Sequence, residues 1–133
     1  MMPCFAESYN FVLTKFSFRE SEAKMITDEF MKEALTKTKN YSAVILKAGP
    51  KFGGPGADKI IWEHGRRNFA LREEGIMPIV CPVLDQSGIC GICILNADIN
   101  KTKNVMDQDP GVHAGIFEYE VHPIRGFPGS ALP

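Results

Sequence analysis

The order of hydrophobic patterns after residue 40 restricts the fold more than any other feature of this sequence. Short apolar or alternating runs, which are typical of strands, are separated twice by stretches with helical periodicity. The patterns predict strands at 41–48, 77–83, 89–96 and 113–121, and helices at 58–74 and 98–108. The resulting order, β-α-β-β-α-β, is that of the ferredoxin-like arrangement. We therefore predict an α+β domain built on one sheet.

Both helices of such a domain lie on one face of the sheet, so the opposite face needs a cover. A second copy of the chain is the usual cover, which predicts a homodimer through the open sheet face. The charge agrees with this, because 15 Lys and Arg against 16 Asp and Glu give a formal net charge of −1. A nearly neutral chain does not strongly repel its own copy.

We divide the chain into an N-terminal extension, 1–40, and a domain, 41–133, that ends in an extended tail rich in Pro and Gly. Within the extension, Ser17 and Glu20 have the spacing of a helix-capping box, and apolar residues recur behind them at helical intervals. This predicts an amphipathic helix at 18–38. One alternative for the whole protein is a structural or interaction module built on this helix.

Composition argues against several classes of partner. A near-zero net charge lacks the basic surface that nucleic-acid binding needs, so we expect no nucleic acid. No apolar run approaches the roughly 20 residues that cross a bilayer, and the N-terminus lacks the features of a signal peptide, so we expect no membrane partner. The chain has 4 cysteines but is long enough to build a core without disulfides, which favours reduced thiols and a cytoplasmic location.

His64 and Asp109 are the strongest candidates for chemistry. His64 lies in the predicted helix 58–74, and Asp109 lies at the end of the predicted helix 98–108. In a split βαβ fold these helices are neighbours on one sheet, so the two side chains can meet although they are far apart in sequence. An Asp bonded to one imidazole nitrogen makes the other nitrogen a general base or acid. The alternatives are a structural histidine and an Asp-Pro pair that only stops a helix.

Two segments of the sequence resemble the YCII-related family. The first, WEHGRRNFALREEGIMPIVCPV, is similar to a helix that carries a His and is followed by a Gly-Pro at the second strand. The second, DQDPGVHAGIFEYEVHPI, is similar to the closing DP motif, last strand and final Pro of that family. The resemblance covers about residues 41–125. It implies a ferredoxin-like α+β fold, a dimeric α+β barrel, and a cleft with a His/Asp pair that maps onto His64 and Asp109.

Further residues are candidates for substrate binding. Lys47 and Arg66 carry charges suited to an anionic or phenolic group, and Trp62 lies close to His64 in sequence; a solvated charge or core packing is the alternative. Cys81 and Pro82 occupy the position of the Gly-Pro pair, so the resemblance implies that they form part of the cleft wall. Cys90 and Cys93 have C-x-x-C spacing, but they fall inside a predicted strand, which favours structural thiols.

These observations lead to one expected function and one principal alternative. The resemblance implies a small cytoplasmic enzyme of the YCII-related type, with lyase or isomerase chemistry on a small, hydroxylated aromatic or lactone substrate. His64 would move the proton and Asp109 would orient it. No motif calls for a metal, nucleotide or flavin, so we expect no cofactor. The alternative is a dimer of the same fold that binds a small ligand without turning it over.

Overall fold

The computed structural model describes residues 24–133, and the boundary between two compact units lies between Thr36 and Lys37. The described part of the first unit contains helix α2, Asp28–Thr36. The prediction of one helix over 18–38 is wrong at 24–27 and 37–38, and residues 18–23 and the Ser17/Glu20 box lie outside the described part. The Thr27 hydroxyl accepts a hydrogen bond from the Phe30 backbone amide at 3.2 Å, so this side chain caps α2 and fixes its start.

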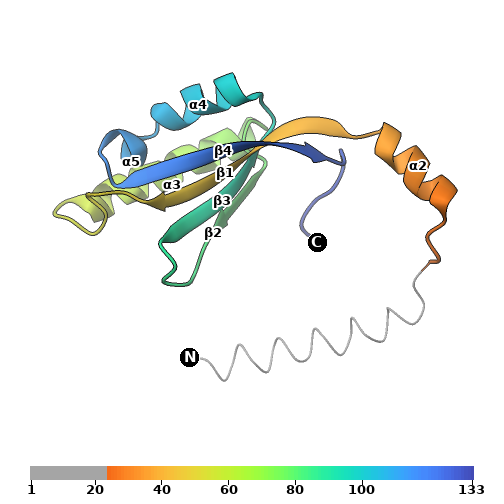
Figure 1. Cartoon of the computed structure of the whole chain (residues 1–133). Coiled ribbons are helices and arrows are strands. Elements are labelled where there is room, and N and C mark those ends of the chain that lie inside the picture. The colour runs from red at the N-terminus through yellow and green to blue at the C-terminus, as the bar shows by residue number, and fades with distance from the viewer. Residues whose placement is uncertain (1–23) are drawn as a thin grey trace. The chain divides into compact units, whose positions relative to one another are not determined.

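The second unit is an α+β domain with a four-stranded antiparallel sheet, as the pattern order predicts (Figure 1). Its strands are β1 (Lys39–Ala48), β2 (Ile79–Pro82), β3 (Ile89–Leu95) and β4 (Phe117–Gly126), and its helices are α3 (Ala57–Glu73), α4 (Ile99–Asp107) and α5 (Pro110–His113). The strand order across the sheet is β2-β3-β1-β4, which is compatible with a ferredoxin-like fold. In the described part of the chain, no helix is both long and apolar enough to cross a membrane.

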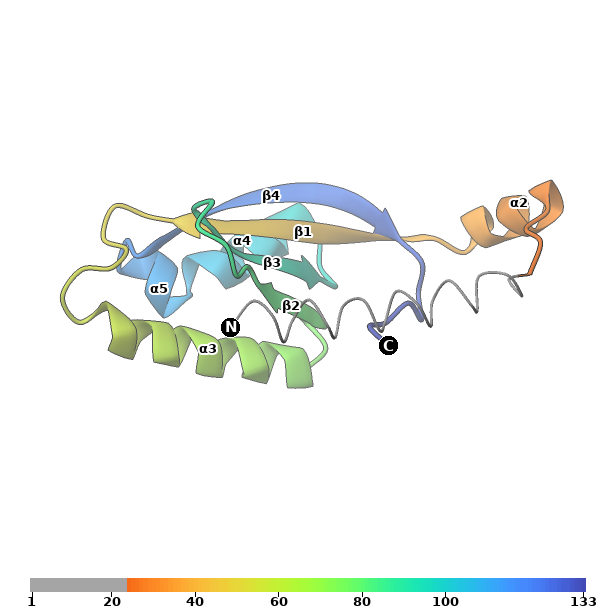
Figure 2. The same ribbon diagram turned by 90° about the horizontal axis from the view of Figure 1, so that it is seen from below.

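The core lies between one face of the sheet and the helices α3, α4 and α5 (Figures 1 and 2). On the central strand β1, Ser42, Val44 and Leu46 are buried, while Ala43 and Ile45 between them are only half-buried. Alternate side chains of a strand point to opposite faces, so the buried set faces the helices. The half-buried set lies on the other face, called here the open face.

Helix α3 begins and ends at glycines with left-handed backbone. Gly56, with φ 75°, precedes it without a side-chain cap. At the other end, Gly75 has φ 74°, and the amides of Gly75 and Ile76 donate to the carbonyls of Arg72 and Leu71. These are the two hydrogen bonds of a Schellman motif, which explains why the helix stops at this glycine.

The chain between α4 and β4 differs from the prediction. The strand expected at 113–121 begins only at Phe117, because Pro110–His113 forms the short helix α5. Pro110 ends one helix but also starts the next, since proline suits the first position of a helix. The strand then continues to Gly126, so residues 122–126 belong to the sheet and not to the extended tail. Likewise β1 begins at Lys39, inside the expected N-terminal extension.

Candidate functional site

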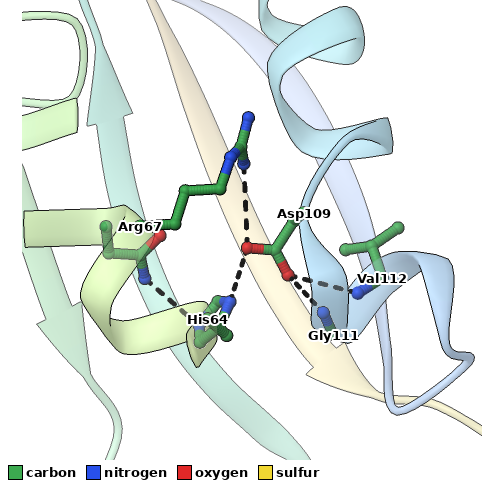
Figure 3. Close-up of polar contacts among 6 residues, drawn as sticks. His64, Arg67, Asp109, Gly111 and Val112 are labelled. Carbon is green, nitrogen blue, oxygen red and sulfur yellow. Dashed lines mark hydrogen bonds and ion pairs between the residues drawn. The ribbon is translucent and has the colours of Figure 1, made fainter. Parts of the chain in front are cut away.

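The site centres on a buried hydrogen bond between His64 on α3 and Asp109 at the start of α5 (Figure 3). The distance from His64 Nδ1 to Asp109 Oδ1 is 2.7 Å, and the exposed fractions of the two side chains are 11% and 1%. Such a short contact with an ionised carboxylate is a strong, charge-assisted hydrogen bond. The two residues are thus in direct contact although 45 positions separate them.

Asp109 is held rigidly because it is also the N-cap of helix α5. Its second oxygen, Oδ2, accepts hydrogen bonds from the backbone amides of Gly111 at 2.9 Å and Val112 at 3.2 Å. Each carboxylate oxygen therefore has its own partner, the helix end on one side and the imidazole on the other (Figure 3). Asp109 was expected at the end of a helix, but it is the residue that begins the next one.

The second imidazole nitrogen of His64 contacts a side chain one helical turn later. Asn68 Nδ2 lies 3.1 Å from His64 Nε2. An amide nitrogen can only donate, so Nε2 accepts, while Nδ1–H donates to the Asp109 carboxylate. This arrangement corresponds to the neutral imidazole with its proton on Nδ1. The Phe117 ring, whose centroid is 4.7 Å from that of the imidazole, covers one face of His64.

His64 and Asn68 line a cleft of about 1030 Å³. Its lining residues come from helix α3, all four strands and the C-terminal segment after Gly126. Among them Tyr41, Ile79 and Ile94 belong to the open face, so the cleft extends around the edge of the sheet. Cys81 and Pro82, the two predicted wall residues, line the same cleft. Asp109 lies behind the imidazole, fully buried, so a molecule in the cleft meets His64 first.

The structure places the other predicted binding residues away from this cleft. The side chain of Arg66 is 68% exposed and pairs with Glu63, and Trp62 is 70% exposed. Lys47 lies on the open face, where its Nζ is 2.6 Å from Glu120 Oε1. Helix geometry explains the first two positions: residues two apart from His64 point away from the face that His64 occupies.

The same geometry identifies two residues that the sequence analysis missed. Arg67 and Asn68 follow His64 by three and four positions, the spacings that share a helix face. Arg67 Nη1 is 3.7 Å from Asp109 Oδ1, and Asn68 contacts His64 directly. The sequence could have identified both residues, because in a helix the residues three and four positions after His64 lie on the same face as His64.

Burial lowers the reactivity of the cysteine thiols near the cleft. Cys81, Cys90 and Cys93 are free thiols. Desolvation, together with the nearby Cys81 and Asp109, raises the pKa of Cys93 to about 11, and desolvation also raises the pKa of Cys90. A raised pKa keeps a thiol protonated and weakly reactive. Within residues 24–133, no group of at least three His, Cys, Asp or Glu side chains is arranged to hold a metal ion.

Comparison with known proteins adds no assignment to this geometry. The sequence matches no protein-family model, and no curated protein matches it.

Proposed function

We propose that this protein is a small acid-base enzyme similar to the YCII-related proteins, in which His64 exchanges a proton with the substrate. The observation that carries the proposal is the 2.7 Å contact between His64 and Asp109 at the wall of a cleft. Asp109 orients the ring and stabilises the imidazolium that forms when His64 takes a proton. This division of roles matches the exposure of the two side chains, since only His64 reaches the cleft.

The proton is exchanged at Nε2, because Nδ1 is already bonded to Asp109. A substrate must therefore displace the Asn68 amide from Nε2 or enter as the amide rotates. When His64 is protonated, the same amide, turned over, offers its oxygen to the new Nε2–H. Asn68 can thus stabilise both protonation states of the imidazole, which suits a residue that gains a proton in one step and returns it in the next.

The cleft favours a small, largely apolar substrate with one acidic proton. Its volume is at the upper limit of the range of known small-molecule sites, about 1,000 Å³, and Phe69, Phe117 and Ile79 are among its lining residues. A hydroxylated aromatic compound or a lactone fits this surface. The reaction class is then an elimination or an isomerisation, in which His64 removes a proton and returns it to the leaving group or to another carbon.

The same resemblance leads us to propose a ferredoxin-like fold that forms a homodimer, a dimeric α+β barrel, through the open face. Ile92 on this face is 45% exposed, with Ile45 opposite it on the paired strand β1 and Ile94 two residues further along β3. Lys47 and His122 both pair with Glu120 on β4, so the charges of the open face are already partly compensated. A cytoplasmic location is supported by the free thiols of the described cysteines.

Turnover of a panel of hydroxylated aromatic and lactone compounds by the full chain tests the activity. In His64→Gln, the rate with an accepted compound should fall by about 10²- to 10⁴-fold, the usual contribution of a positioned acid-base group. His113→Gln is the matched control, because His113 is exposed at the end of α5. Equal rates in wild type and His64→Gln would refute the proposal. Ligand binding without turnover would favour the alternative, a binding protein of the same fold.

Sedimentation of the purified chain tests the dimer. Ile92→Glu introduces a charge into the open face and should yield a monomer. Trp62→Glu makes a comparable change on the exposed side of α3 and should leave the dimer intact. Dissociation by Trp62→Glu alone would place the interface on the helices and contradict the proposed dimer.

A further inference from the structure

Arg67, whose side chain is 24% exposed, contributes a half-buried positive charge to the site without making a hydrogen bond to it. Its Nη1 atom is buried and has no hydrogen-bond partner among the described residues. The nearest acidic atom is Asp109 Oδ1, at 3.7 Å, the same oxygen that contacts His64 (Figure 3). Leaving a buried guanidinium donor unpaired is costly, so this position calls for an explanation.

Arg67 is not needed to orient the Asp109 carboxylate. Asp109 Oδ2 is fixed by the amides of Gly111 and Val112, and Oδ1 by His64. Arg67 is too far from Oδ1 for a hydrogen bond and does not form the two-pronged contact that Arg makes with carboxylates when it fixes their orientation. Its effect on Asp109 is therefore that of a nearby charge, which does not depend on exact alignment.

A charge at this place decides whether His64 is ready to accept a proton. Without Arg67, the negative charge of the buried Asp109 carboxylate is balanced only when the His64 imidazole takes up a proton, which gives a pair with no net charge. With Arg67, the carboxylate is already compensated, so a second positive charge on the imidazole gains less. The Arg67 charge thus favours the neutral imidazole, the form that can act as a base.

We propose that Arg67 acts on the His64/Asp109 pair through its charge and favours the neutral form of the His64 imidazole. Its importance for turnover rests on the function proposed above, but the charge effect itself does not. Of the other titratable groups around the pair, the Cys93 thiol on β3 is buried and stays protonated below about pH 11. His113 on α5 and Glu63 on α3 are exposed to solvent.

The test is the protonation state of His64 in the free, full-length protein, followed by long-range ¹H–¹⁵N imidazole spectra from pH 5 to 9. The His64 signals are identified by their loss in His64→Gln. In Arg67→Met, the ratio of charged to neutral imidazole at pH 7 should rise about tenfold, the low end of the effect of a nearby charge. Arg67→Lys should keep this ratio close to the wild-type value.

Arg66→Met is the matched control, because it removes an equal charge from the exposed neighbour and should leave the His64 ratio unchanged. If Arg67→Met unfolds the protein, Arg67→Gln, which keeps polar contacts, replaces it. An unchanged ratio in a folded Arg67→Met or Arg67→Gln variant would overturn the proposal. A ratio in Arg67→Lys as high as in Arg67→Met would also overturn it, by showing that the guanidinium shape matters and not the charge. These measurements need no substrate. They can therefore support or refute the charge effect of Arg67 whether or not the protein has the proposed enzyme activity.

Discussion

The ring of Phe117 lies directly against the backbone of Gly111. A Cβ atom added at Gly111 would be 2.5 Å from Cδ2 of this ring and 3.1 Å from Oδ2 of Asp109. The ring also covers His64, so one aromatic side chain touches the imidazole and the turn that holds its partner. The absence of a side chain at residue 111 is therefore part of the construction of the site.

Gly111→Ala should lower the free energy of unfolding by about 1–3 kcal/mol, because the inserted methyl group must displace the Phe117 ring. Denaturant unfolding of the two proteins measures the difference. Gly65→Ala is the control: an added Cβ there has no described atom within 4 Å, and replacing a glycine inside a helix should stabilise by roughly 0.5–1 kcal/mol. A destabilisation by Gly65→Ala as large as that by Gly111→Ala would contradict this account.

Asp109→Ala should destabilise the protein by about 3–5 kcal/mol, because it removes the buried carboxylate that compensates the charge of Arg67 and leaves the amides at the start of α5 without their acceptor. Asp109→Asn keeps an oxygen that can cap α5, so its loss of stability should be clearly smaller. Both values come from denaturant unfolding at pH 7. Equal losses for the two variants would mean that the cap contributes little and the charge nearly everything.

Alkaline pH should weaken the fold through Cys93. The pKa of this thiol is raised by burial from 9.0 to about 11, so the unfolded chain releases the proton at lower pH than the folded chain. Its contribution is therefore fully present below pH 9 and is lost as the pH rises to 11, by up to about 2–3 kcal/mol. Comparing unfolding at pH 8 and pH 10.5 in wild type and Cys93→Ala isolates this effect.

Tyr119 does not obscure the comparison. Burial and the hydrogen bond to Asp107 raise the pKa of Tyr119 to about 12, and this group is present in both proteins. The loss of stability between the two pH values should be smaller in Cys93→Ala than in wild type. An equal loss would show that Cys93 titrates alike in the folded and unfolded chain.

Thiol reagents should distinguish the cysteines of the cleft. Cys93 is 4% exposed, whereas Cys81 and Cys90 are half-buried. At pH 8, iodoacetamide should modify Cys81 and Cys90 first and Cys93 only at the rate of unfolding, as peptide mass spectrometry would reveal. Modification of Cys93 ahead of the other two in the native protein would refute the buried position assigned to this thiol.

The sequence was most informative where one pattern dominated. The run YSAVILKA predicted the strand at 41–48 that the structure has as β1, and the helical pattern predicted α3 to within one residue at each end. The segment HAGIFEYEV was misleading: its alternation suggested a strand from His113, but capping by Asp109 and the proline after it favour a helical turn over the first of these residues.

Within the site, the sequence predicted the two residues that meet but not all of their neighbours. Arg66 was chosen over Arg67, although their chemistry is the same and only their helical phase differs. Lys47 lies on the open face because side chains alternate along β1, and its ion pair with Glu120, which is opposite Ile45 on β4, could not be read from local patterns. Contacts between distant elements depend on strand pairing, which composition and spacing do not specify.

Proline lies in both border strands of the sheet, Pro82 in β2 and Pro123 in β4. Each removes an amide that an incoming strand would need for a continuous ladder of hydrogen bonds. Sideways growth of the sheet into an open-ended polymer is thereby disfavoured. For the proposed dimer, this leaves stacking of the two sheets face to face, which gives a closed assembly.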